Sequence, residues 1–329
     1  MEPRRHHDLG GLAAGPVDRE AHDLAPWEAR TDALVYLLIA RRAIRTDELR
    51  REIESLGPDE YRAAGYYHRW LHALVRLLLE KGGVTVAGLA GALATRPGEP
   101  ARGGSSPGGL TPGSGPVGRG TGAPVATTTG PESGILQDDP SALADAVADL
   151  VVDAGLLDRE TLETAVAARV PGPPPVAPVI VRAWRDQAFR ARLLDDPLGA
   201  CIEAGLTLPP TWPRVVVLDN AGPVHHVVAC TLCSCHSRPL MGVPPPWYKG
   251  HEYRSRVVRE PRAVLAEFGL TLDAGRSVRV QDASADLRYI VLPSPPDGYE
   301  RVDDATLAGA VTPEVLLGVA HPALLAIHN

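Results

Sequence analysis

A long segment rich in glycine, proline, serine and threonine divides this chain into two unequal parts. Between Arg96 and Gly134, Leu110 is the only large aliphatic residue before Val117. Such a composition cannot bury enough apolar surface to offset the entropy that is lost when a backbone is ordered. We therefore expect a flexible linker at residues 96–139, with one folded segment before it and another after it.

The segment before the linker, residues 1–95, has the pattern of a helical domain that follows a short glycine-rich arm. Helices are predicted at residues 27–42, 46–57, 66–81 and 86–94. Apolar residues recur at helical spacing in the first and third of these ranges. Thr46 is typical of a helix N-cap, because acidic residues follow in the first turn.

The segment after the linker, residues 140–329, changes character along its length. Helical spacing dominates at first, and runs of β-branched residues appear from about Arg214 onward. Helices are predicted at 141–154, 158–168, 179–185, 187–194, 198–204 and 261–268, and strands at 215–218, 224–228, 277–282 and 287–292. The expected fold class is α+β, in which helices precede a layered core of helices and strands.

Charge and hydropathy exclude several partners. The chain has 33 basic and 40 acidic residues and a net charge of −7, which argues against nucleic acid as a ligand. The longest apolar stretch, residues 33–40, is too short to span a membrane. No apolar run follows the basic residues near Met1, so we expect no signal peptide and a cytoplasmic location. Four cysteines are too few for a disulfide framework in such a chain.

Three of the four cysteines lie within six residues, in the run Cys230-Thr-Leu-Cys-Ser-Cys235. A tight loop can bring all three sulfurs to one centre, and soft thiolates suit zinc, copper(I), iron–sulfur clusters, iron or cobalt. One reading is a structural zinc site that a neighbouring histidine completes, with His225, His226 and His236 as candidates. Buried free thiols and a catalytic metal are the other readings, and the spacing by itself leaves all three open.

The residues around these cysteines resemble the claw-setting segment of nitrile hydratase and thiocyanate hydrolase. Beyond the hexapeptide, the resemblance includes Gly-Val-Pro-Pro-Pro-Trp-Tyr-Lys at 242–249 and Leu-Arg-Tyr-Ile-Val-Leu-Pro at 287–293, and it covers nearly all of residues 140–320. The first 95 residues resemble the N-terminal half of the β subunit of that enzyme, through motifs such as His-Asp-Leu-Gly-Gly at 7–11 and Tyr-Tyr-His-Arg-Trp-Leu at 66–71. The chain therefore looks like a fusion of a β-type half with an α-type catalytic domain.

The resemblance implies a metal centre with a defined set of ligands. These are the sulfurs of Cys230, Cys233 and Cys235 and the backbone amide nitrogens of Ser234 and Cys235. It further implies that Cys233 is a sulfinate and Cys235 a sulfenate, while Cys230 stays a thiolate. Thr231 is the residue usual in cobalt members, so one cobalt(III) per chain is expected, with iron(III) as the alternative. Hydration of a nitrile to its amide follows, with either the Cys235 sulfenate or an activated water as nucleophile.

The resemblance also implies roles for residues in the β-type half and for partners. Arg50 matches an arginine that bonds the oxidised sulfurs, and Tyr67 matches a tyrosine near the substrate. The family's second such arginine belongs to a small SH3-like β-barrel without a counterpart here, so we expect a separate subunit of that kind. A hetero-oligomer with two copies of this chain and a metal-loading activator protein are also expected.

Three residues depart from the family pattern and bear on the substrate. His236 and Arg238 stand after the third cysteine, where small or aromatic residues are usual, and Gln281 replaces a frequent tryptophan. Thiocyanate hydrolysis is an alternative activity, since thiocyanate hydrolases, which the chain also resembles, split the β part into separate chains. A non-catalytic metal-binding or assembly subunit is a further alternative, and it predicts zinc or no metal together with unmodified cysteines.

Overall fold

The computed structural model describes residues 5–20, 24–96, 138–169, 172–209 and 212–324. Within these ranges the chain forms two compact units. One comprises residues 25–166 and is referred to as the helical unit, and the other comprises residues up to 24 and from 167 onward and is referred to as the mixed unit. The mixed helix-and-strand class predicted from the sequence is confirmed. Residues 97–137 of the predicted linker lie outside the described residues.

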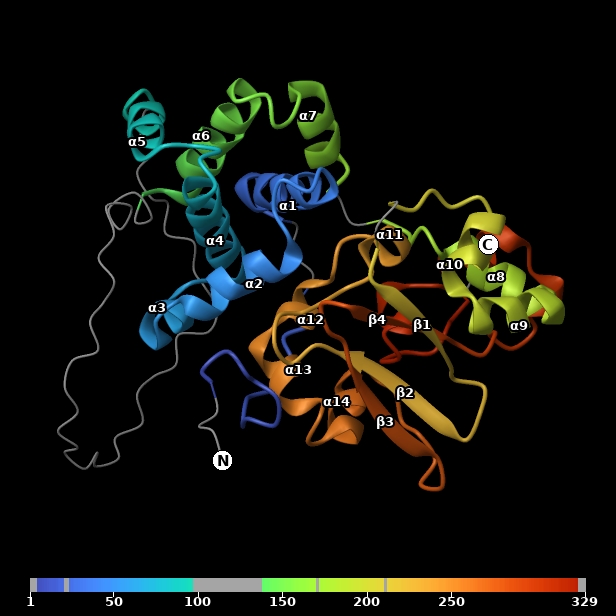
Figure 1. The fold of residues 1–329 in the computed structure, drawn as a ribbon. Coiled ribbons are helices and arrows are strands. Elements are labelled where there is room, and N and C mark those ends of the chain that lie inside the picture. The colour runs from blue at the N-terminus through green and yellow to red at the C-terminus, as the bar shows by residue number, and fades with distance from the viewer. Residues whose placement is uncertain (1–4, 21–23, 97–137, 170–171, 210–211, 325–329) are drawn as a thin grey trace, which may run out of the picture. The chain divides into compact units, whose positions relative to one another are not determined.

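The helical unit contains seven helices among its described residues (Figure 1). They are α1 (Pro26–Ala40), α2 (Thr46–Ser55), α3 (Pro58–Ala63), α4 (Tyr66–Glu80), α5 (Val86–Ala94), α6 (Pro140–Asp153) and α7 (Arg159–Ala167). Helix α2 begins with Thr46 as its first helical residue, and Arg45 is the N-cap residue in place of the predicted Thr46. The Glu48 carboxylate accepts a hydrogen bond from the backbone N–H of Arg45 at 2.9 Å and thereby caps the helix start. Helix α3 was not predicted, because its six residues are too few to show a period.

The compact units divide differently from the predicted sequence segments. Helices α6 and α7 follow the linker in sequence, yet they share an apolar core with α1, α4 and α5. Leu143, Val147 and Val151 of α6 are fully buried in that core. Ion pairs join α1 to the same region, including one between Arg30 and Asp145. Helix α6 belongs to the helical unit because its apolar face packs against helices of the first half and is thereby removed from water.

The mixed unit is built from short helices around two small sheets (Figure 1). Its helices are α8 (Ala177–Arg185), α9 (Gln187–Asp195), α10 (Pro197–Glu203), α11 (Arg238–Met241), α12 (Pro246–Lys249), α13 (His251–Arg256), α14 (Pro261–Glu267), α15 (Asp304–Gly309) and α16 (Pro313–Leu316), with a 3-10 turn, η2, at Tyr299–Arg301. The strands are β1 (Arg214–Asp219), β2 (Val224–Ala229), β3 (Ser277–Asp282) and β4 (Leu287–Leu292). Strand β1 pairs with β4 and β2 pairs with β3, both in parallel.

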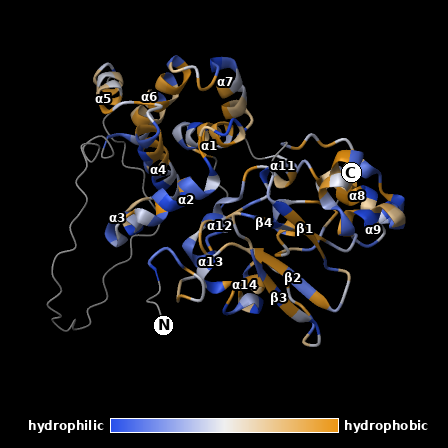
Figure 2. Cartoon of the chain, in the orientation of Figure 1, coloured by the Kyte–Doolittle hydropathy of each residue, from blue (hydrophilic) through white to orange (hydrophobic). Residues whose placement is uncertain are grey.

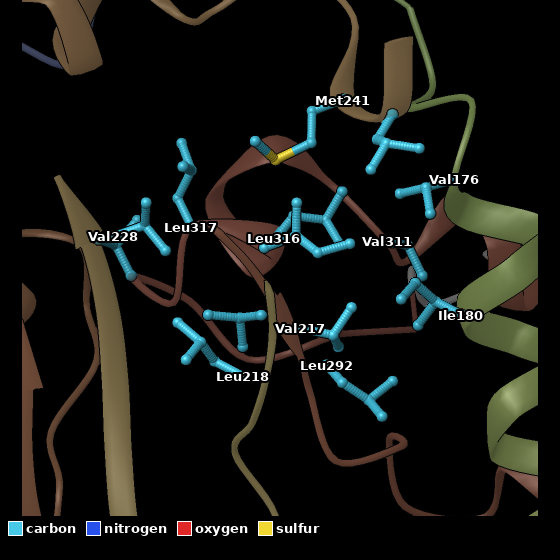
Figure 3. Close-up of a cluster of buried hydrophobic side chains, with 14 of the residues drawn as sticks. Val176, Ile180, Val217, Leu218, Val228, Met241, Leu292, Val311, Leu316 and Leu317 are labelled. Carbon is cyan, nitrogen blue, oxygen red and sulfur yellow. The ribbon is translucent and has the colours of Figure 1, made fainter. Parts of the chain in front are cut away.

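Apolar side chains from the strands and helices of the mixed unit meet in one core. Figure 2 shows hydrophobic residues along β1 and β2, and Figure 3 shows Val217 and Leu218 of β1 in a cluster that also contains Leu316 and Val311. The inner residues of β2 and β4, such as Val228 and Leu292, belong to the same core. This core holds the ends of β2 and β3 in place. Among the described residues, no helix combines the length and the apolar character needed to cross a membrane.

Candidate metal centre

The loop Cys230–Cys235, called the cysteine loop below, begins where strand β2 ends. Ala229, the last residue of β2, is paired with Asp282, the last residue of the parallel strand β3. Parallel strands end at the same edge of a sheet, so the Asp282 carboxylate lies at the start of the loop. It accepts hydrogen bonds from the backbone N–H of Thr231 at 2.9 Å and from the Thr231 hydroxyl at 2.6 Å.

The loop brings its three sulfur atoms together. The Sγ atom of Cys233 lies 3.6 Å from that of Cys230 and 3.1 Å from that of Cys235. Ser234 has φ = 59°, in the left-handed region, and this turn folds the chain back between two cysteines that would stand farther apart in an extended backbone. All three cysteines are free thiols rather than disulfide partners.

This sulfur geometry fits a single metal ion. The three ligand atoms all lie within 4.8 Å of one another. An ion that binds sulfur at about 2.3 Å places two sulfurs ~3.3 Å apart at a right angle and ~3.8 Å apart at the tetrahedral angle. The observed separations of 3.1 and 3.6 Å are close to these values. The cysteine loop can therefore hold one soft or borderline ion without rearrangement.

The electrostatics of the thiols also favour a cation. Hydrogen bonds from the thiols of Cys233 and Cys235 lower the pKa of Cys230 well below its usual value. Hydrogen bonding to the Cys230 and Cys233 sulfurs, together with burial, raises the pKa of Cys235 well above its usual value. The pKa shifts of Cys230 and Cys235 thus have opposite directions, and a bound cation would favour the deprotonated form of all three sulfurs.

Buried side chains from α12 and α13 hold the backbone of the cysteine loop. Arg254 is 2% exposed and donates from Nε to the carbonyl of Cys230 at 3.0 Å and from Nη2 to the carbonyl of Thr231 at 2.9 Å. The Tyr248 hydroxyl donates to the carbonyl of Cys235 at 2.7 Å. The loop is thereby bonded at both ends, so its sulfurs are preorganised.

The histidines near the loop do not complete a zinc site. Among the described residues, the metal-ligand group contains the three cysteines and no histidine. His225 uses both ring nitrogens, since Nε2 donates to the Gly318 carbonyl at 2.7 Å and Nδ1 accepts from Asn220 at 3.3 Å. His226 Nδ1 lies 3.3 Å from the Gln281 amide nitrogen. The structural zinc reading with three cysteines and a histidine is therefore not supported.

Burial of His225 predicts a pH dependence of stability. Burial lowers the pKa of this imidazole from 6.5 to about 4. Between these pH values the unfolded chain binds more protons at His225 than the folded chain, so the stability present above pH 6.5 is lost as the pH falls towards 4. The loss attributable to this residue should be about 3 kcal/mol. Urea unfolding of the His225→Gln variant should show a correspondingly weaker dependence on pH over this range.

The exposed His251 provides the control for that measurement. Its replacement by glutamine should leave the pH dependence of the free energy of unfolding close to that of the unaltered chain. Equal slopes for the His225→Gln variant and the unaltered chain would contradict the prediction.

The two residues predicted from the β-type half lie in the helical unit. Arg50 is on α2, where its guanidinium nitrogens lie 3.5 Å from Glu54 and 3.8 Å from Asp47. Tyr67 is on α4 and 2% exposed, and its hydroxyl donates to Asp32 at 3.2 Å. The metal and substrate roles of both residues stay predictions.

The residues that depart from the family pattern lie beside the loop. His236 is buried, with its ring centroid 5.5 Å from that of Tyr248. Arg238 begins α11, three residues after Cys235 in sequence. Gln281 is on β3 next to His226.

Sequence reasoning missed the residues that brace the loop. Arg254 and Tyr248 stand in segments that carried the resemblance, but nothing in their spacing pointed to carbonyls of the cysteine loop. Asp282 had a weak signal, because an acidic residue at the very end of a strand lies at a sheet edge. Only the pairing of β2 with β3 identifies its partner.

Comparison with known proteins places both segments. Residues 138–320 match the family described as nitrile hydratase, alpha chain, and residues 4–108 match the N-terminal part of the nitrile hydratase beta subunit. The low-molecular weight cobalt-containing nitrile hydratase subunit alpha of Rhodococcus rhodochrous is 42% identical over 201 residues, which is 60% of this chain and 97% of that protein.

Solved structures are similar over the same region. A recombinant thiocyanate hydrolase with partially modified cobalt centres is 37% identical, with a TM-score of 0.52 over 57% of this chain and 91% of that one. A double mutant of the Fe-type nitrile hydratase from Comamonas testosteroni Ni1 is 37% identical, with a TM-score of 0.51 over 56% of this chain and 92% of that one. The similarity thus includes proteins whose names specify cobalt and iron.

Proposed function

Because this chain belongs to the family of nitrile hydratase alpha chains, we propose that it hydrates a nitrile to the corresponding amide at a cobalt(III) centre in the cysteine loop. The observation that carries the proposal is the approach of three free sulfurs to within 4.8 Å of one another in a loop braced at both ends. A segment that matches the beta subunit precedes it in the same chain, as in a fusion of the two subunit types.

The proposed ligands are the sulfurs of Cys230, Cys233 and Cys235 and the backbone amide nitrogens of Ser234 and Cys235. A trivalent ion bound there supplies Lewis acidity that polarises a nitrile. Cobalt is favoured by Thr231 and by the cobalt-containing relative, and iron is the alternative that the Fe-type relative represents.

The burial of each cysteine supports the proposed oxidation states. Cys233 is partly exposed, whereas Cys230 and Cys235 are 0% and 7% exposed. Oxygen therefore reaches Cys233 most easily, which fits oxidation as far as the sulfinate. Cys235 is proposed to stop at the sulfenate and to act as the nucleophile or to orient water. Its burial keeps that group away from bulk water and reductants.

The experiment that tests this function combines metal content, mass and turnover. Chain expressed with cobalt and its partner subunits should contain about one cobalt per cysteine loop and should convert nitriles to amides. The peptide that contains Cys230–Cys235 should show the mass of a sulfinate and a sulfenate. Active preparations with stoichiometric zinc and plain thiols would contradict the proposal and favour a non-catalytic metal-binding or assembly role.

Thiocyanate hydrolysis is the second candidate function. Arg238 follows the cysteine loop by three residues, and a cation near the substrate would attract an anion such as thiocyanate. The similarity to a thiocyanate hydrolase structure supports the same candidate. Turnover measured on organic nitriles and on thiocyanate, with amide and ammonia as the respective products, separates the two.

Arg50 is proposed to bond the oxidised sulfurs, and Tyr67 to contact the substrate. Lysine at position 50 would keep the charge but lose the planar fork, so we expect Arg50→Lys to lower kcat about 100-fold while the helical content stays unchanged. The measurement is turnover together with circular dichroism.

Arg51 is the matched control for the Arg50 variant. It is the next residue on α2, and it is exposed and bonded to Glu80 at 2.6 Å. The Arg51→Lys variant should therefore keep its turnover. Unchanged turnover in the Arg50→Lys variant would mean that Arg50 has no part in the reaction and only forms ion pairs with neighbouring residues of α2.

We further propose that a separate small β-rich subunit of roughly 100 residues completes the enzyme and donates a second arginine. Two copies of this chain are proposed per assembly, with an activator protein for metal loading. Chain expressed alone should have little hydratase activity, and co-expression with such a subunit should restore it. Full activity of the chain alone would refute the need for that subunit.

A further inference from the structure

Residues 5–20, called the N-terminal arm below, lie in the mixed unit together with the cysteine loop. They belong to the segment that matches the beta subunit, whereas the loop belongs to the segment that matches the alpha chain. A beta-type segment is thus part of the same compact unit as the alpha-type metal loop.

The second half of the arm is anchored away from the loop. The backbone N–H of Val17 donates to the Glu267 carboxylate at 2.8 Å, and the Val17 side chain is buried in the apolar core. Arg256 donates from Nη1 to the carbonyl of Gly15 at 2.9 Å. The Arg19 guanidinium lies 4.9 Å from the centre of the Phe268 ring. These contacts fix the course of the arm over α13 and α14.

The first half of the arm contacts the cysteine loop directly. The backbone N–H of Leu9 donates to the Thr231 carbonyl at 3.3 Å, and that of Gly11 donates to the Ser255 carbonyl at 2.7 Å. Between them, Gly10 faces the Thr231 side chain. A Cβ atom at Gly10 would lie 3.0 Å from Thr231 Cγ2 and 3.2 Å from Thr231 Cβ. Such contacts are tighter than nearly all real Cβ contacts, so alanine at position 10 would require Thr231 or the arm to shift by a few tenths of an ångström.

Thr231 has little freedom to move away from a larger residue. Its N–H and hydroxyl bond Asp282 at 2.9 and 2.6 Å, and its carbonyl accepts from Arg254 at 2.9 Å. The carbonyl also accepts from Leu9 of the arm. Every polar group of Thr231 is therefore hydrogen-bonded. A larger residue at position 10 that displaces the Thr231 methyl group would therefore also displace the loop that carries the three sulfurs.

We propose that the N-terminal arm is a positioning element of the metal centre, and that close packing of Gly10 on Thr231 keeps the three sulfurs together and shielded. In this role the arm acts through Thr231. The shielding of the three thiols is a property of the metal-free chain and does not depend on the reaction. Only the effect on cobalt content rests on the proposed function.

The test measures thiol accessibility in reduced chain expressed without cobalt. Iodoacetamide labelling of the Cys230–Cys235 peptide, followed by mass spectrometry, should be roughly tenfold faster in Gly10→Ala than in the unaltered chain. Gly15→Ala is the matched control, because no atom lies within 4 Å of a Cβ there. Cys201 is fully buried in the core of the same unit and serves as an internal reference for unfolding. Its labelling should stay as slow as in the unaltered chain.

A second variant tests whether the contact itself is responsible. Thr231→Ser removes Cγ2, the atom nearest to a Cβ at position 10, but keeps the hydroxyl that bonds Asp282, so it relieves the tightest contact of alanine at position 10. Labelling of the double variant Gly10→Ala/Thr231→Ser should return to within about twofold of Thr231→Ser alone. Cobalt content per chain after expression with cobalt should fall in Gly10→Ala and recover in the double variant.

Three results would overturn the proposal. They are equal labelling of the Gly10→Ala and Gly15→Ala loops, faster labelling of Cys201 in parallel with the loop, and no recovery in the double variant. Parallel labelling of Cys201 would show general unfolding rather than a loosened loop. A chain that binds zinc through plain thiols would refute the proposed function and leave the labelling result intact, so the two failures are distinguishable.

Discussion

The Cys230→Ser variant should lose cobalt and hydratase activity together. Cys230 is fully buried and its thiol has the lowered pKa of the loop, so it is the sulfur best suited to remain a thiolate ligand. A serine hydroxyl is a hard donor that stays protonated at neutral pH, and it cannot replace a thiolate towards a soft ion. We expect cobalt content to fall close to zero and turnover to fall by at least about a thousandfold. Metal analysis and a hydration assay on the same preparation measure both.

The matched control for this variant is Cys201→Ser. Cys201 is equally buried but lies in the apolar core on α10, where burial raises the pKa of its thiol to about 11. Its replacement should reduce stability modestly and leave the cobalt content per folded chain unchanged. Active, cobalt-containing Cys230→Ser protein would exclude the cysteine loop as the metal centre.

The Arg254→Met variant should destabilise the cysteine loop more than any change to a surface arginine. Arg254 is buried and its guanidinium donates to two loop carbonyls, those of Cys230 and Thr231. Methionine retains much of the volume but provides no donor. Hydrogen bonds from a charged group contribute about 1.5–3 kcal/mol each, so the mixed unit should lose about 3–5 kcal/mol of stability. Loss of the brace should also abolish cobalt incorporation.

The stability of the mixed unit can be followed separately from that of the helical unit. Pulsed labelling of Cys201 at increasing urea concentration reports the opening of the mixed unit, because this thiol is buried in its core. The stability of the Arg254→Lys variant should lie between those of the unaltered chain and Arg254→Met, because one ammonium group cannot reproduce the two-pronged donor geometry of a guanidinium.

Arg262 on α14 provides a control of the same bonding type. It is exposed and donates to three backbone carbonyls, those of Leu272 at 3.1 Å, of Asp273 at 3.3 Å and of Arg276. The Arg262→Met variant should shift the labelling midpoint only slightly and should load cobalt normally. Equal effects of the two substitutions on cobalt content would contradict a brace at Arg254.

The electrostatics of the loop connect these predictions. The three sulfurs lie close enough to share one ion, but without a cation the pKa shifts of Cys230 and Cys235 have opposite directions. The buried bonds from Arg254 and Tyr248 hold both ends of the loop that carries the sulfurs. A centre of this kind is organised before metal arrives, so its failure in a brace variant should appear first as lost metal and only then as lost turnover.

Local signals in the sequence were sufficient for the longer helices, the four strands and the clustering of three cysteines. Helical spacing predicted residues 66–81, and helix α4 spans Tyr66–Glu80. The strand predicted at 277–282 is observed as β3 with the same bounds. The run Cys230–Cys235 predicted that three sulfurs can reach one centre, because cysteines so close in sequence cannot be far apart in space. These features depend on neighbours along the chain, so a single sequence contains them.

Tertiary structure alone decided what holds the loop and which segments pack together. Arg254, Asp282 and Gly10 come from three distant parts of the sequence, and they meet Thr231 only because β2 pairs with β3 and the arm crosses α13. Helix α6 follows the linker, yet its apolar face is covered by the helices that precede it. By itself the sequence determined that three thiols lie close together, through the identity and spacing of its cysteines. Its bracing depended on long-range burial and pairing, which no local pattern encodes.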